Sequence, residues 1–99
     1  MTQANPAGAG PSPEIEMFSG PGCAYCAQSR ALLEARSLPY IEYDVADPSH
    51  MTEFTRRLPR TRALPQIFIG GEHVGSFEDL QALDAGGGLA GLRKDSAGG

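Results

Sequence analysis

Residues 14–45 carry the clearest structural signal in the chain, EIEMFSGPGCAYCAQSRALLEARSLPYIEYDV. Residues 14–19 begin with alternating polar and apolar side chains, which is typical of a short strand. In residues 24–35 alanine recurs every three or four positions, and this spacing predicts a helix of about twelve residues. Residues 40–45 are rich in aromatic and β-branched side chains and indicate a second strand. A strand, a helix and a strand in this order form a right-handed crossover with parallel strands.

The following forty residues predict two more helices and a hairpin. Asp47 can cap the N-terminus of one helix, and Pro59 ends that helix. Two apolar segments flank Gly70-Gly71, which predicts a two-residue β-hairpin. Ser76 and Asp79 have the spacing of a capping box and begin a last helix. The expected fold class is α/β, a four-stranded mixed sheet flanked by helices in the order β-α-β-α-β-β-α.

The ends of the chain differ in composition from its middle. The 99 residues suffice for one domain. The 13 glycines and 8 prolines approach the level typical of disordered chains, and about half of them lie near the two ends. We therefore expect a disordered Pro/Gly/Ala-rich tail over 1–13, one folded domain over 14–93 and a flexible tail over 94–99.

Charge and hydropathy exclude several kinds of partner. The formal net charge of −4 argues against a nucleic-acid-binding protein, which would usually be basic. The longest apolar run is far shorter than the roughly 20 residues that span a bilayer, so we expect no membrane span. The N-terminal residues lack the basic and apolar regions of a secretory signal, so we expect the protein to be cytoplasmic.

The two cysteines lie in Cys23-Ala24-Tyr25-Cys26, where the first strand leads into the first helix. A thiol at a helix N-terminus faces unpaired backbone N–H groups and the positive end of the helix dipole, and both lower its pKa from the free value near 8.5. Cys23 would have that position, and Cys26 would lie one turn later on the same side, buried as a thiol. We expect Cys23 to be the nucleophile and Cys26 the resolving thiol, with sulfurs close enough to form a disulfide.

Three other interpretations of the cysteine pair are open. The cysteines could be small buried apolar residues. A zinc site needs about four ligands, and His50 and His73 lie outside the usual zinc-ligand spacing. A structural disulfide is uncommon in a chain without an export signal. A redox-active dithiol is therefore the favoured interpretation.

Three motifs resemble the glutaredoxin family, and the resemblance is greatest to the bacterial dithiol members. They are Cys-Ala-Tyr-Cys at 23–26, Arg-Ala-Leu-Pro-Gln-Ile-Phe-Ile at 62–69 and Gly-Ser-Phe-Glu-Asp-Leu at 75–80, and they match C-P-Y-C, R-T-V-P-x-I-F-I and G-G-C-x-D-L of the family. The resemblance implies a monomer with a thioredoxin-like fold. It also implies glutathione-dependent reduction of protein disulfides and of protein–glutathione mixed disulfides, with Cys23 attacking the mixed disulfide.

The resemblance also implies a glutathione site. Its candidate residues are Tyr25, Arg62, Leu64, Pro65, Glu78 and Asp79. A cis bond before Pro65 would turn the backbone of Leu64 toward an extended thiol substrate, which could pair with it as a strand would. The N-terminus of the last helix can receive the γ-glutamyl carboxylate. Arg57 and Arg60, nearby in the sequence, are expected to be a solvated helix end.

Departures from the family pattern leave two further functions open. Ala24 stands where the family motif has proline, and such replacements occur in members that hold a [2Fe–2S] cluster between two protomers through the nucleophilic cysteine and glutathione. Cys23 would then be a cluster ligand, and otherwise we expect no metal. A glutaredoxin-like protein reduced by thioredoxin reductase is a third possibility, but its Trp-Ser-Gly-Phe signature is absent and the chain has no tryptophan.

Overall fold

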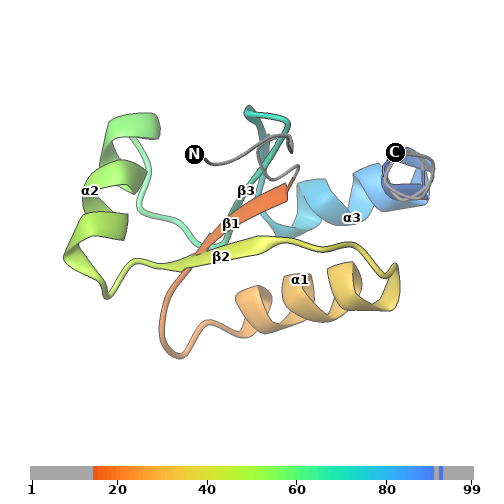
Figure 1. The fold of residues 1–99 in the computed structure, drawn as a ribbon, viewed down its shortest axis with the longest axis horizontal. Coiled ribbons are helices and arrows are strands. Elements are labelled where there is room, and N and C mark those ends of the chain that lie inside the picture. Colours follow the sequence, from red (N-terminus) through yellow and green to blue (C-terminus); the bar gives the residue numbers. More distant parts are fainter. Residues whose placement is uncertain (1–14, 91, 93–99) are drawn as a thin grey trace, which may run out of the picture.

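The computed structural model describes residues 15–90 and 92, so the tails expected over 1–13 and 94–99 lie outside the described residues. The elements follow the expected order (Figure 1), and they are β1 (Ile15–Ser19), α1 (Ala24–Ala35), β2 (Ile41–Asp44), α2 (Pro48–Arg57), β3 (Gln66–Ile69), β4 (Glu72–Gly75) and α3 (Phe77–Ala85). Residues 88–90 form a further helical segment after α3.

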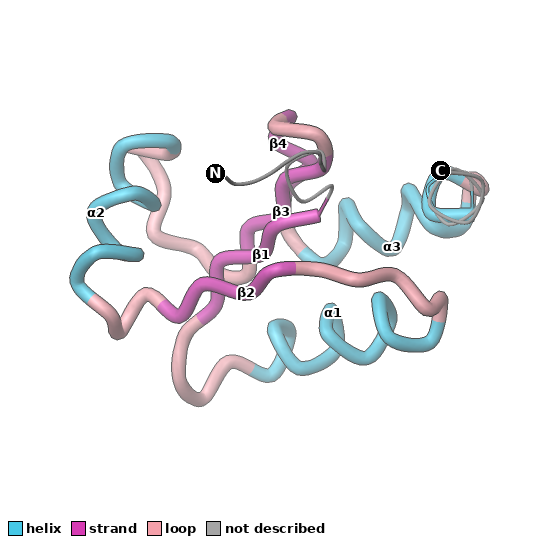
Figure 2. The backbone as a smooth tube through the Cα atoms, viewed as in Figure 1, coloured by secondary structure: helices cyan, strands magenta, loops and turns pink. Residues whose placement is uncertain are grey.

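The four strands form one mixed sheet in the order β2-β1-β3-β4 (Figure 2). β1 and β2 are parallel, as the crossover predicts, and β3 is antiparallel to both β1 and β4. The hairpin turn between β3 and β4 is Gly70-Gly71, and both glycines have positive φ, the conformation that makes them suited to this turn. The predicted four-stranded mixed sheet is confirmed.

Local signals set the helix boundaries. α1 has the expected twelve residues, and α2 begins after Asp47, whose Oδ1 accepts a hydrogen bond from the Ser49 backbone N–H at 2.9 Å. β2 is shorter than the predicted 40–45, because its ladder with β1 ends at Asp44. The Val45 N–H still donates to the Ser19 carbonyl at 2.8 Å, so the chain stays attached to β1 beyond the strand.

Each face of the sheet has its own core, because successive side chains of a strand point to opposite faces. One face packs against α1 and α3 through Ile15, Met17, Leu33, Leu38, Ile67, Leu80 and Leu89. The other face packs against α2 through the aromatic cluster, which we define as Phe18, Phe54 and Phe68. Phe18 is at its centre, with ring centroids 5.3 Å from Phe54 and 6.1 Å from Phe68. Helices therefore cover both faces.

Arg57 corrects one prediction. Its guanidinium, expected in solvent, donates hydrogen bonds to Glu53 at 2.6 Å and to Glu16 of β1 at 3.2 Å, and it lies 5.0 Å from the centroid of the Phe68 ring. The expectation was wrong because the last turn of α2 packs on the aromatic face of the sheet, where a guanidinium can pair with carboxylates and stack on rings. Arg60, one turn later, is exposed as expected.

Candidate active site

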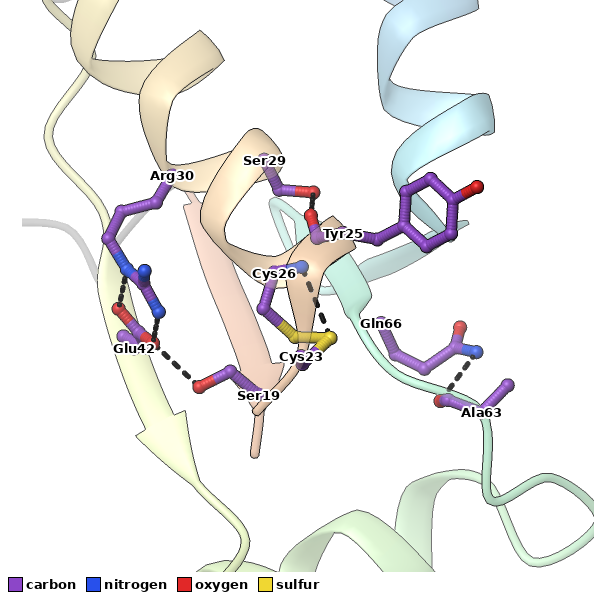
Figure 3. Close-up of a disulfide and its surroundings, with 9 residues drawn as sticks. All are labelled: Ser19, Cys23, Tyr25, Cys26, Ser29, Arg30, Glu42, Ala63 and Gln66. Carbon is purple, nitrogen blue, oxygen red and sulfur yellow. Dashed lines mark hydrogen bonds and ion pairs between the residues drawn. A yellow bond between two sulfur atoms is a disulfide. The ribbon is translucent and has the colours of Figure 1, made fainter. Parts of the chain in front are cut away.

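The two cysteines lie at the start of α1, joined by a disulfide (Figure 3). Cys23 is the N-cap of the helix and is partly exposed, whereas Cys26 is fully buried. Gly22 turns the chain into the helix with φ of 69°, a conformation that disfavours residues with a Cβ. The expected arrangement of an accessible cysteine and a buried one is confirmed.

The environment of the Cys23 sulfur favours negative charge. The Cys26 backbone N–H donates to Cys23 Sγ at 3.1 Å, and the sulfur lies at the positive end of the dipole of α1. After reduction the same N–H can donate to a thiolate, which accepts hydrogen bonds more strongly than a thiol. Cys23, the more accessible of the two cysteines, is therefore also the one whose thiolate the helix N-terminus stabilises.

A polar network holds the elements around the dithiol in place (Figure 3). Ser19, the buried last residue of β1, donates to Glu42 of β2 at 2.6 Å, and Arg30 of α1 makes a bidentate pair with Glu42 at 2.9 and 2.6 Å. The bonds from Arg30 hold the pKa of Glu42 below its usual value, with a further contribution from the Ser19 hydroxyl. The network links β1, β2 and α1 just before and after the cysteine loop.

This network predicts a change in acid stability. The pKa of the Glu42 carboxyl is lower in the folded protein than in the unfolded chain, where it is near 4.5. Ionised Glu42 therefore stabilises the fold above pH 4.5, and this contribution is lost as pH falls through the folded pKa. We expect Glu42→Gln to lower the free energy of unfolding by about 1 kcal/mol at pH 7, and the difference from wild type to shrink as pH falls below about 4.5. Urea denaturation at pH 7, 5 and 3 measures it. Glu72→Gln, at an exposed site on β4, is the control, and a gap that stays constant with pH would contradict the assignment.

A groove of about 220 Å³ lies beside the dithiol, lined by Tyr25, Leu64, Pro65, Ser76, Phe77 and Glu78. The bond before Pro65 is cis, as expected, and Pro65 is buried. Gly20 allows the cysteine loop to approach this segment closely, because a Cβ at Gly20 would lie 2.9 Å from Leu64 Cδ1. The rings of Tyr25 and Phe77 stack with centroids 6.0 Å apart, so α1 and α3 meet through an aromatic pair on the groove wall.

The groove contains most of the residues predicted for glutathione, but not all. Tyr25, Leu64, Pro65 and Glu78 line it, whereas Arg62 and Asp79 are not on its lining. Asp79 Oδ2 instead accepts hydrogen bonds from the Ser76 N–H at 2.9 Å and the Ser76 hydroxyl at 3.2 Å, so this oxygen is engaged in capping α3. Ser76 and Phe77 also line the groove but were not among the candidate glutathione contacts. The Ser76-Phe77 departure from the family's Gly-Cys predicted a bulky ring near the groove, and the capping box identified Ser76 as a helix start and therefore as an anion-binding position.

The described residues contain neither a metal centre nor a membrane span. Within 15–90 and 92, no group of three or more His, Cys, Asp or Glu side chains could hold a metal ion. None of the helices in this part of the chain is long and apolar enough to cross a membrane.

A partly exposed cysteine at a helix N-terminus, together with a cis proline that directly precedes a strand of the same sheet, defines a thiol–disulfide oxidoreductase of the thioredoxin-like class. The family model "Glutaredoxin" matches residues 15–74. The chain belongs to the glutaredoxin family, as the sequence motifs suggested, and it is a glutaredoxin-type oxidoreductase.

Individual relatives agree. The chain is 42% identical over 80 residues to a glutaredoxin of Neisseria meningitidis serogroup B, a match that covers 79% of this chain and 93% of that protein. A solution structure of a glutaredoxin from Brucella melitensis is 40% identical with a TM-score of 0.66, over 88% of this chain and 95% of that one. A crystal structure of a buckwheat glutaredoxin–glutathione complex has a TM-score of 0.69 over 83% of this chain and 77% of that one. Its identity of 20% supports the fold alone.

Proposed function

We propose that this protein uses glutathione to reduce protein disulfides and protein–glutathione mixed disulfides through Cys23 and Cys26. The observation that carries the proposal is the position of Cys23, which is partly exposed at a helix N-terminus two residues before Tyr25, a residue that lines the groove of about 220 Å³. The buckwheat glutaredoxin was crystallised as a complex with glutathione, which is consistent with such a ligand.

The first step transfers glutathione from the substrate to Cys23. The Cys23 thiolate attacks the glutathione sulfur of the mixed disulfide, the new Cys23–glutathione bond forms, and the substrate cysteine leaves as a thiolate that takes a proton from water. The N–H of Cys26, which already faces the Cys23 sulfur, stabilises the attacking thiolate before the reaction. The buried Cys26 thiol does not compete for the substrate.

Two routes complete the cycle. In the first, the thiolate of a free glutathione attacks the bound glutathione sulfur, which releases oxidised glutathione and regenerates the Cys23 thiolate. In the second, Cys26 loses its proton and attacks the Cys23 sulfur, and glutathione leaves. Two further glutathione molecules then reduce the resulting disulfide, which is the form that the structure shows. Both routes have the same balance: the first consumes one free glutathione, the second consumes two and releases one, and each yields one oxidised glutathione and one reduced substrate thiol.

We propose the groove residues Tyr25, Leu64, Pro65 and Glu78 as the glutathione contacts. The backbone of Leu64 would pair with the peptide backbone of glutathione, and the N-terminus of α3 beside Glu78 would receive its γ-glutamyl carboxylate. Arg62 and Asp79 stay predictions. The monomeric state and the cytoplasmic location are also proposals.

Glutathione dependence is tested by omission. We expect the protein to reduce a peptide disulfide that contains no glutathione when glutathione, glutathione reductase and NADPH are present, and to give no sustained turnover when glutathione is left out. The reason is that the first step is then stoichiometric and leaves Cys23 oxidised. NADPH consumption measures turnover, and mass spectrometry of the protein identifies the Cys23–glutathione adduct. Equal turnover with thioredoxin and its reductase as the only reductant would contradict glutathione dependence.

The [2Fe–2S] alternative stays a prediction, which rests on Ala24 in the position of the family's proline. Its test is the visible absorption spectrum and the molecular mass of the protein purified without oxygen. A coloured dimer that Cys23→Ser bleaches would support cluster binding.

A further inference from the structure

Gln66 is a buried polar side chain directly after Pro65, with 6% of its surface exposed. It begins β3, pairs with Phe18 across the β1–β3 ladder and lies on the α2 face of the sheet. Burying a side-chain amide among aromatic rings is unfavourable unless both its donor and its acceptor find partners. The hydrogen-bond partners of the Gln66 side chain therefore indicate its role.

Both ends of the Gln66 amide are hydrogen-bonded. Its Nε2 donates to the Ala63 carbonyl at 3.1 Å, and its Oε1 lies 2.7 Å from Nε2 of His73 in β4. The orientation of the amide follows from chemistry, because the Ala63 carbonyl can only accept and must face the NH₂ group. His73 Nε2 is therefore the donor to Gln66 Oε1. The His73 ring is itself fixed against Phe68, with centroids 5.1 Å apart.

The bond to Ala63 also determines where the next N–H points. The Ala63 carbonyl and the Leu64 N–H belong to one planar trans peptide group, in which C=O and N–H point in opposite directions. Holding the Ala63 oxygen on Gln66 (Figure 3) therefore turns the Leu64 N–H away from Gln66. The Ala63 N–H donates to Thr61 Oγ1 at 3.1 Å and restrains the same segment from its other side.

The Leu64 N–H is available to a ligand. Leu64 lines the groove beside the dithiol. Among the hydrogen bonds within residues 15–90 and 92, none uses the Leu64 N–H as donor. The Leu64 side chain packs against the aromatic cluster, which anchors the residue and leaves its backbone for the substrate.

We propose that Gln66 and His73 are positioning residues, which aim the Leu64 N–H at a backbone carbonyl of the peptide bound in disulfide linkage to Cys23. His73 orients Gln66, Gln66 orients the Ala63–Leu64 peptide group, and that group meets the substrate. The substrate class is an extended thiol peptide, of which glutathione is one. The inference rests on the proposed function, because it assigns a supporting pair to the same groove.

The first experiment measures KM and kcat of Gln66→Met for a glutathionylated peptide. Methionine has a similar length but cannot hydrogen-bond to Ala63. We expect KM to rise about three- to tenfold, with kcat within about twofold, as for one hydrogen bond made equally to bound substrate and transition state. An unchanged KM in a variant that melts like wild type overturns the proposal, and so does a loss of kcat alone.

The second experiment needs no substrate, so its failure can be told from a failure of the proposed function. Backbone ¹⁵N relaxation of the reduced protein should give Leu64 an order parameter near that of rigid backbone, about 0.85, and Gln66→Met should lower it toward about 0.6. An equally rigid Leu64 in the variant overturns the proposal, whatever the activity of the wild type.

Two histidine variants complete the test. His73→Phe keeps a ring on Phe68 but removes the donor to Gln66. We expect KM to rise two- to threefold, less than for Gln66→Met, because Gln66 keeps its bond to Ala63 and loses only the group that orients it. His73→Phe also decides the matter if Gln66→Met does not fold, because His73 is exposed. The matched control is His50→Phe. The His50 ring also packs against an aromatic ring, that of Tyr43, and its Nδ1 is hydrogen-bonded to the Asp44 carbonyl. His50 does not line the groove, so His50→Phe should leave KM unchanged. Equal effects of the two histidine variants on KM would overturn the proposal.

Discussion

Cys23→Ser is expected to abolish the reduction of a glutathionylated peptide, with a loss on the order of 10³-fold or more. A serine hydroxyl has no thiolate form and cannot make the mixed disulfide with glutathione, so the first covalent step has no substitute. The coupled assay with glutathione reductase and NADPH measures the loss. Preserved far-UV circular dichroism and thermal melting show that the variant is folded.

Cys26→Ser is the matched control for this prediction. It makes the same atomic change one helical turn away, at a fully buried sulfur. We expect substantial activity to remain on glutathione mixed disulfides, because free glutathione can regenerate Cys23 without the resolving thiol. Reduction of a protein disulfide that depends on the Cys23–Cys26 disulfide should fall more. If Cys23→Ser kept full activity, or if Cys26→Ser were the inactive variant, the assignment of nucleophile and resolving thiol would be wrong.

The largest expected effect on stability comes from Phe18→Ala. Phe18 is fully buried, and its ring packs at a tilt against Tyr43 and Phe54 and edge-on against Phe68. The Arg57 guanidinium lies 5.5 Å from its ring centroid. Removing this ring leaves a cavity between the sheet and α2. We expect a loss of about 3–5 kcal/mol, a large part of the roughly 5–15 kcal/mol that stabilises a domain. Urea denaturation of the reduced protein measures it.

Tyr25→Ala is the control for the loss of an aromatic ring. Tyr25 is 55% exposed and contacts Phe77 on the groove wall. Its truncation should cost less than about 1 kcal/mol, since little apolar surface returns to water. If the two variants lost similar stability, the aromatic cluster would not be the second core of the fold.

The sequence indicated the order of elements because the signals that set it act within a few residues. The alanine spacing gave the twelve residues of α1, Asp47 gave the start of α2, and Gly70-Gly71 gave the hairpin. The signal for the dithiol site is also local in the sequence, because its chemistry depends on the N-terminus of a helix that Cys23 itself caps. These features are encoded by residues that are close together in the sequence.

The networks around the site could not be predicted because they join residues that are distant in the sequence. Arg57 and Glu16 are 41 residues apart, and Arg30 and Glu42 are 12 apart. The sequence shows that acidic residues are available to pair with Arg57, but not which of them lies close to it. The packing of α2 on the aromatic face decides that Arg57 pairs with Glu16 instead of extending into water. The same holds for Asp79, which the sequence offered both as a cap and as a ligand contact, and whose Oδ2 the folded helix uses as a cap.

The sequence by itself thus determined the α/β architecture, the redox-active cysteine pair and their different exposures. Local propensities and helix-terminus electrostatics are encoded in neighbouring residues. Only the tertiary structure decided which walls form the groove, with Phe77 against Tyr25, and how the Ala63–Leu64 peptide is held by Gln66 and His73. Those contacts depend on the close approach of α1, α3 and the β3–β4 hairpin, which the long-range packing of two cores sets.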